Sequence, residues 1–270
     1  INSHIHLEFS GNTTTLKYGN FYSWLNSVIK HREDLISKAN TKLILSKLSK
    51  MKRTGTTTIG AISSYSFDLD ACVKSPLNKV FFCEVIGTKG DMIDTLFADF
   101  KDRLNIAKKY KSANFIPAIA IHSPYSVHPF LVRETLKLAR EENLPVTSHF
   151  LESREEFEWL HKDEGAFVEF FKNFLGQEQS VTKPMEFLNL FSNIKNLSFT
   201  HCVEASSDDF DKIKLLGASI NHCVTSNRLL NNTKLDLEKL KDIPFTIGTD
   251  GLSSNNSLSM FDELRNVLMA

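Results

Sequence analysis

Short apolar runs alternate along the whole chain with longer segments in which hydrophobic residues recur every three or four positions. The short runs predict strands and the longer segments predict helices. Eight strands are expected, at residues 1–7, 56–63, 79–86, 115–122, 144–149, 197–201, 218–223 and 245–249. Helices are expected at residues 21–50, 68–74, 91–109, 130–142, 153–160, 167–175, 184–191, 206–216, 235–241 and 258–269. Residues 8–20 are polar and contain glycine, so a loop is expected there.

This alternation predicts an α/β fold with a parallel sheet. The strands are continuously apolar rather than alternating, as expected when helices cover a sheet on both faces. Eight strand–helix units, and a length of 270 residues, favour a closed (β/α)8 barrel of the TIM type, which typically needs about 250 residues. A doubly wound open sheet is the competing architecture. The absence of a glycine-rich phosphate loop after the first strand argues against its nucleotide-binding version.

Composition and charge exclude several classes of partner. The 32 basic residues balance the 32 acidic residues, so no net charge favours nucleic acid or an anionic membrane. The chain lacks the P-C-x-x-C signature of the zinc deaminases that act on nucleic acids. It also has no apolar run of the roughly 18 to 20 residues that a membrane span requires.

The ends of the chain and its cysteines bear on its origin. The sequence opens directly on a predicted strand, so no signal peptide is expected. The four cysteines form no C-x-x-C pair, so a reducing cytoplasm is expected. The chain begins on a strand and lacks an initiating Met. We therefore expect residues 1–270 to form one domain of a longer protein, with residues missing at both ends.

Polar residues suited to metal binding stand where the predicted strands end. His4 and His6 are two residues apart, so both imidazoles point to the same side of the first strand. Chemistry in α/β barrels takes place at the carboxyl ends of the strands. The other candidates at such ends are His122, His149 with the following Glu152, His201, His222 and Asp250.

Each of these residues also has an ordinary structural interpretation. A single His at a strand end is more often a hydrogen-bonded structural residue, Glu152 could favour a helix dipole, and Asp250 could be a turn residue before Gly251. However, six of the nine histidines follow strands, and only His31, His128 and His161 do not. Imidazoles and a carboxylate in this arrangement favour one divalent cation with a position left for water, and Glu152 could move protons beside it.

At these residues the chain resembles the amidohydrolase superfamily, in its cytosine/adenosine-deaminase-like and chlorohydrolase-like branch. The matching segments, in the order of the family, are N-S-H-I-H at 2–6, H-S-P-Y-S at 122–126, S-H-F-L-E-S at 148–153, T-H at 200–201, H-C-V-T-S-N at 222–227 and G-T-D-G-L-S-S-N at 248–255. The resemblance implies a barrel with its metal site at the C-terminal mouth. It also implies a small flanking β-sandwich, whose segments are missing from this chain.

The resemblance assigns roles to individual residues. It implies that His4, His6, His149 and Asp250 hold one Zn or Fe ion. Glu152 would be the proton shuttle, and His201 would lie beside the attacking hydroxide. Asp250 would also accept a proton from the attacking water, and His122 would contact the substrate.

Details of several loops resemble deaminases of an adenine nucleoside that carries a carboxyphenyl group in place of the 5′ hydroxyl, in the alternative menaquinone pathway. Glu33 resembles a carboxylate that holds ribose hydroxyls, although a solvated surface charge explains it equally well. Arg228 could pair with the substrate carboxylate or be an ordinary surface residue. Val224 replaces a proline of the branch, so His222 is interpreted as structural.

Other members of the branch give the alternatives: deaminases of adenosine, S-adenosylhomocysteine or guanine, or a chlorohydrolase. An alternative of another class is a catalytically inactive barrel that only binds metal, against which the intact Glu152 argues. The expected partner is a small nucleoside. Barrels of this kind often pair, so a homodimer stays an open alternative.

Overall fold

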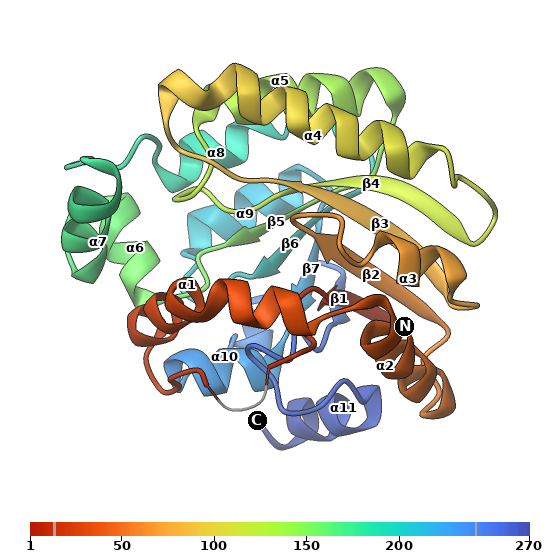
Figure 1. The fold of residues 1–270 in the computed structure, drawn as a ribbon. Coiled ribbons are helices and arrows are strands. Elements are labelled where there is room, and N and C mark those ends of the chain that lie inside the picture. The colour runs from red at the N-terminus through yellow and green to blue at the C-terminus, as the bar shows by residue number, and fades with distance from the viewer. Residues whose placement is uncertain (13–14, 241) are drawn as a thin grey trace.

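The computed structural model describes residues 1–12, 15–240 and 242–270, and its centre is an eight-stranded parallel sheet (Figure 1). Neighbouring strands pair in chain order from first to last. The strands are β1 (Asn2–His6), β2 (Thr58–Ser63), β3 (Asn78–Val85), β4 (Phe115–Ile121), β5 (Val146–Phe150), β6 (Leu197–His201), β7 (Ser219–His222) and β8 (Phe245–Ile247).

Hydrogen bonds between the first strand and the segment after the last one bring the sheet round into a nearly closed barrel. The Asp250 amide donates to the His4 carbonyl at 3.0 Å. The Asn2 side chain accepts from the Thr249 amide at 3.0 Å and donates to the Thr249 hydroxyl at 2.7 Å. The predicted (β/α)8 barrel is therefore confirmed, and the open doubly wound sheet is excluded.

Helices surround the strands (Figure 1). They are α1 (Phe21–Lys38), α2 (Thr41–Arg53), α3 (Leu69–Lys74), α4 (Ile93–Lys108), α5 (Pro129–Glu142), α6 (Arg154–Lys162), α7 (Ala166–Leu175), α8 (Pro184–Leu190), α9 (Ser207–Leu215), α10 (Val224–Asn231) and α11 (Met260–Met269), with 3-10 turns η1 (Gly90–Met92) and η2 (Leu237–Leu240). Among the described residues, no helix is both long and apolar enough to cross a membrane.

The predicted helix over residues 21–50 is wrong in one respect, because the structure divides it into α1 and α2. Asn40 accepts from the Leu43 amide at 3.0 Å and so caps a new helix. Hydrophobic spacing continues through this break, and no glycine or proline marks it. Asn40 was the one signal of a helix start.

Two further differences lie between β7 and β8. Helix α10 was not predicted, because its sequence V-T-S-N-R-L-L-N is poor in strong helix formers. Its Ser226 and Asn227 are buried and face the strand ends, as the site below shows. The helix predicted at 235–241 is the short turn η2, and residue 241 lies outside the described residues.

The long connection between β5 and β6 contains α6, α7 and α8, as predicted. Phe167 and Phe171 of α7 are buried in the main core, where Phe171 stacks on Trp159 of α6 at 4.9 Å between ring centroids. This packing anchors α7, so its remaining aromatic residues are held over the carboxyl ends of the strands.

Candidate active site

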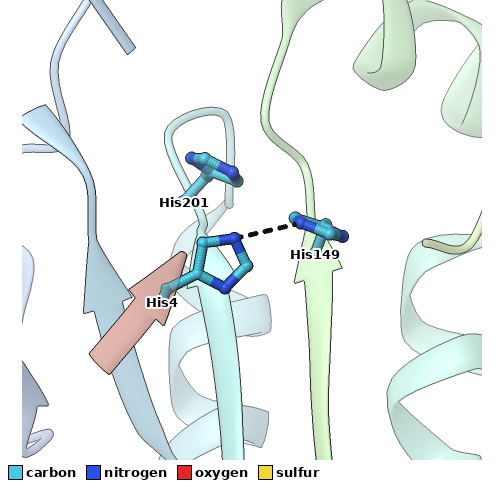
Figure 2. Close-up of side chains that lie close together, drawn as sticks. All are labelled: His4, His149 and His201. Atoms are coloured by element: carbon cyan, nitrogen blue, oxygen red, sulfur yellow. Dashed lines mark hydrogen bonds between the residues drawn. The ribbon is translucent and has the colours of Figure 1, made fainter. Parts of the chain in front are cut away.

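Four side chains that are far apart in the sequence converge at the carboxyl ends of β1 and β5 and just after β8. The Nε2 atoms of His4, His6 and His149 lie 3.2 Å from one another in all three pairs. Asp250 Oδ1 lies 3.7 Å from His4 Nε2 and 3.6 Å from His6 Nε2. Figure 2 shows the His4 and His149 rings meeting edge to face, with His201 beside them on β6.

These distances suit a cation better than a set of direct hydrogen bonds. Two ligands at zinc–nitrogen bond length and tetrahedral angles lie about 3.3 Å apart. Three imidazole nitrogens at equal separation cannot all donate to and accept from one another. The donor set therefore fits one divalent ion that takes nitrogen and oxygen ligands, such as zinc or iron.

The histidines are neutral, as metal ligands must be. Burial lowers the pKa of His6 to about 3, and it lowers the pKa values of His4 and His149 in the same direction. Burial alone would raise the pKa of Asp250, but His6 and His4 beside it hold that pKa well below its usual value. Asp250 is therefore a carboxylate facing three neutral imidazoles.

Hydrogen bonds outside the cluster fix the orientation of these groups. His149 Nδ1 donates to the His122 carbonyl at 2.7 Å, which leaves the lone pair of Nε2 facing the cluster. The hydroxyls of Ser226 and Ser254 both donate to Asp250 Oδ2 at 2.7 Å. The Oδ1 atom is thereby directed to His4 and His6.

Glu152 and His201 lie next to the cluster, with 3.4 Å between Glu152 Oε1 and His201 Nε2. Burial raises the pKa of Glu152 well above its usual value, and the nearby carboxylates of Asp250 and Glu156 add to this. Asn227 Oδ1 lies 2.8 Å from His201 Nδ1, which donates to it and so orients the ring. Glu152 therefore binds a proton more tightly than an exposed carboxyl group does, which suits a general acid or base.

Left-handed backbone geometry gathers around these residues. Leu151, His201, Cys202 and Asp250 have φ values of 45°, 73°, 53° and 59°. Side chains other than glycine adopt this region at a cost, and such strain is concentrated at functional sites. Glu156 offsets part of the cost after β5 by accepting the amides of Leu151 and Glu152 at 3.1 and 2.8 Å.

A cavity of about 430 Å³ opens onto the cluster. Its polar end carries Glu152, Asp250 and the histidines described above except His4. Its walls are largely apolar, and Trp24 and Ile29 of α1 and Phe170 and Phe174 of α7 contribute to them. The cavity thus joins a metal-binding end to largely apolar walls.

The structure brings together most of the residues expected from the sequence, but not all. His122 lines the cavity, whereas Glu33 and Arg228 are exposed and are absent from its lining. Arg32 lines the cavity instead, and the next residue of a helix points about 100° away. The expected substrate contacts of Glu33 and Arg228 are therefore not supported. His222 is buried and does not line the cavity, which fits the structural interpretation.

Two carboxylates near the cavity were missed in the sequence. Glu84 lies near the end of β3 and lines the cavity while only 1% exposed. Glu8 is buried and accepts the amides of Ser64, Tyr65 and Phe67. The signal for Glu84 was a carboxylate that directly follows an apolar run in the strand, since an unpaired charge is seldom buried without a function.

Comparisons with known proteins agree with this geometry. A sequence model of the amidohydrolase family matches residues 1–270. The chain is 49% identical over 267 residues to an aminodeoxyfutalosine deaminase from Nitratiruptor sp., covering 99% of this chain and 66% of the relative. It is 34% identical to an adenosine deaminase from Helicobacter pylori, covering 100% of this chain and 66% of that relative. The chain thus spans about two thirds of the length of these curated relatives.

Solved structures show the same fold. A crystal structure of Helicobacter pylori aminofutalosine deaminase with methylthio-coformycin matches with a TM-score of 0.92 at 31% identity, over 99% of this chain and 66% of that one. An adenosine deaminase from Xanthomonas campestris with bound zinc matches with a TM-score of 0.72 at 20% identity, over 99% of this chain and 59% of that one. The second likeness is evidence for the fold alone.

Proposed function

This chain belongs to the amidohydrolase family, and we propose that it is the barrel of a metal-dependent deaminase that converts aminodeoxyfutalosine to futalosine and ammonia. In this reaction water replaces the 6-amino group of the adenine ring. The 49% identity to an aminodeoxyfutalosine deaminase supports the substrate. Because the chain spans about two thirds of that relative, the activity of the whole protein is a proposal.

One observation carries the proposal: a buried carboxyl group, Glu152, stands three residues after His149, beside a cluster that fits a divalent cation. His4, His6, His149 and Asp250 would hold the ion, and the chemistry of these donors suits either zinc or iron. A divalent ion in such a site supplies Lewis acidity that makes water nucleophilic at neutral pH. A barrel that only binds metal has no need of a proton-carrying carboxyl group here.

The residues of the chain account for the proton movements. Glu152, whose pKa is raised by burial, gives a proton to the ring nitrogen next to the carbon that bears the amine. His201, which lies next to Glu152, orients the attacking water, and Asn227 fixes the ring of His201. Asp250 accepts a proton from that water and passes it to the amine, which leaves as ammonia. The proton of the new hydroxyl returns to Glu152 as the carbonyl of the product forms.

The apolar walls of the cavity suit the remainder of this substrate. Aminodeoxyfutalosine carries a carboxyphenyl group in place of the 5′ hydroxyl of adenosine. Aromatic side chains such as Phe170 and Phe174 can pack against its phenyl ring. Arg32 and Lys89, also in the cavity lining, can meet its carboxylate.

A second candidate substrate is adenosine, because a relative at 34% identity is an adenosine deaminase. Adenosine would fill the polar end of the cavity but leave the aromatic walls without a partner. We therefore favour the larger nucleoside, and we place the enzyme in menaquinone biosynthesis in the cytoplasm. The four cysteines are free and buried, which is compatible with a reducing compartment.

The test measures ammonia released by the complete protein, loaded with zinc or with iron, from aminodeoxyfutalosine, adenosine, guanosine and a chlorinated triazine. We expect aminodeoxyfutalosine to give the highest kcat/KM, and Glu152→Gln to abolish most of it. Glu158→Gln, a partly exposed residue of α6 that does not line the cavity, is the matched control and should retain activity. Higher kcat/KM for adenosine would reassign the substrate, and full activity of Glu152→Gln would refute the reaction mechanism.

A further inference from the structure

Glu84 is a buried carboxylate in the cavity that the proposed reaction does not use. Its side chain is only 1% exposed. Among the described residues, none donates a hydrogen bond to its Oε1 atom. A buried carboxylate oxygen without a donor is costly, and in a native structure it calls for an explanation. A bound molecule that supplies the missing donor would be one.

The other contacts of Glu84 hold it in place, so the free oxygen does not result from a loosely held side chain. The Ser64 hydroxyl donates to Oε2 at 2.5 Å. Ser64 itself is fixed, because its amide donates to the Glu8 carboxylate at 2.7 Å. Arg103 Nη2 donates to the Glu84 carbonyl at 2.9 Å. The Oε1 atom is thus a preformed acceptor.

Two imidazoles lie next to this acceptor. A carboxylate oxygen of Glu84 and ring nitrogens of His122 and His149 lie within 4.8 Å of one another. The Oε1 atom is 4.0 Å from His149 Nδ1, which is too long for a hydrogen bond, and that nitrogen already donates to the His122 carbonyl. His149 therefore cannot satisfy Glu84.

His122 can supply a donor to the same ligand atom. Its Nδ1 lies 2.5 Å from the Ser126 hydroxyl, which lies 2.5 Å from the Ser123 hydroxyl. When the serines donate along this chain to Nδ1, the proton of the neutral imidazole is on Nε2. Glu84 and His122, which both line the cavity, then offer it an acceptor and a donor.

We propose that Glu84 and His122 bind a hydroxyl of the substrate's sugar, which donates to Glu84 Oε1 and accepts from His122 Nε2. The inference rests on the proposed function, because it takes the substrate to be a nucleoside. A hydroxyl is the group that uses both partners, since it donates and accepts at one atom. A ring N–H would satisfy Glu84 and leave His122 without a partner.

The test is equilibrium binding of inosine, 2′-deoxyinosine and 3′-deoxyinosine to the metal-loaded complete protein, because these nucleosides have no amine to lose. Without the sugar hydroxyl the buried Glu84 oxygen again lacks a donor, so we expect the wild type to bind one deoxynucleoside roughly 10- to 100-fold more weakly than inosine. Ammonia release from the matching adenosine series is measured in parallel. The two deoxy compounds identify which hydroxyl is bound.

Glu84→Gln removes the acceptor with little change in shape. Ser64 needs an acceptor, so the amide places its carbonyl toward Ser64 and its NH2 in the cavity. We expect this variant to bind inosine no more tightly than the deoxyinosine that the wild type binds weakly. The preference for inosine over that deoxyinosine is then lost. Asp68→Asn is the control, since Asp68 is a fully buried carboxylate that does not line the cavity. It should keep the preference.

The outcomes separate this inference from the proposed function. If Glu84→Gln loses the preference for inosine and neither the wild type nor a variant releases ammonia, the subsite is supported and the deaminase is refuted. Ammonia release with the preference unchanged in Glu84→Gln overturns the subsite and leaves the deaminase standing. The subsite is also overturned if the wild type binds adenine more tightly than 9-methyladenine and Glu84→Gln does not, because the group that donates to Glu84 is then a ring N–H. If Glu84→Gln does not fold, Ser64→Ala frees the carboxylate to rotate and should weaken the preference; an unchanged preference there overturns the proposal.

Discussion

The hydrogen bonds that orient the Asp250 carboxylate give a test of the metal site that leaves the four proposed ligands in place. Its Oδ2 atom accepts two hydroxyl hydrogen bonds, from Ser226 on α10 and from Ser254 on the loop after β8, each at 2.7 Å. Both serines are buried, and no water can readily replace a lost hydroxyl. Ser226→Ala and Ser254→Ala each remove one donor and leave the carboxylate present.

The expected loss follows from the strength of these bonds. A hydrogen bond to a charged group contributes about 1.5 to 3 kcal/mol. If most of that energy serves to hold Oδ1 toward His4 and His6, each variant binds zinc roughly 10- to 100-fold more weakly, as is usual when a partner of a metal ligand is removed. The double variant should be weaker than either single variant, because Oδ2 is then buried without a donor.

The assay is competition for zinc between the protein and a chromophoric chelator at fixed pH. Ser257→Ala is the matched control, because Ser257 lies in the same loop and donates to Asp262 at 2.8 Å, away from the cluster. Thermal unfolding of the metal-free proteins shows whether a variant loses stability rather than metal affinity. Zinc affinities of both single variants and the double variant equal to that of Ser257→Ala would refute this role of the serines.

Three other predictions concern catalysis, stability and specificity. Glu152→Gln should lower kcat by roughly 10²- to 10⁴-fold, because the amide cannot transfer a proton, while the zinc content measured by atomic absorption stays at the wild-type value; a loss of zinc would instead make Glu152 a ligand. Burial raises the pKa of Asp68 to about 7, so the native state binds a proton that the unfolded chain releases near pH 4, and the free energy of unfolding should fall as pH rises from about 4 to about 7. Asp68→Asn should flatten that dependence in urea titrations, and an equal slope in both proteins would contradict the assignment. Phe174 is 60% exposed and lines the cavity, so it should affect substrate binding more than stability. Phe174→Ala should raise KM for aminodeoxyfutalosine but not for adenosine. An equal rise in KM for both substrates would show that Phe174 does not bind the carboxyphenyl group.

The sequence was sufficient for the barrel and for the centre of the site because both follow from strong local patterns. Continuous apolar strands require cover on both faces, and parallel strands bring their carboxyl ends to one side. Residues as distant as His4 and Asp250 could therefore be placed together before the structure was known. The resemblance to the amidohydrolase superfamily is confirmed by the family match.

The sequence was insufficient wherever a side chain's direction depends on tertiary packing. Glu33 and Arg32 are neighbours on α1, and only the packing of that helix decides that Arg32 lines the cavity. Glu84 was not predicted because it stands before the last residue of its strand, whereas the predicted site residues stand at or just after strand ends. Helix α10 was missed because its polar residues are buried by the contacts they make with Asp250 and His201, which no local propensity records.

The central claim is that a single cation, held by His4, His6, His149 and Asp250, is required for deamination. Titrating the metal-free complete protein with zinc while following ammonia release from aminodeoxyfutalosine tests it most directly. We expect activity to rise linearly and reach its plateau at one zinc per chain. Full activity without metal, or a plateau only at two zinc ions per chain, would contradict this account.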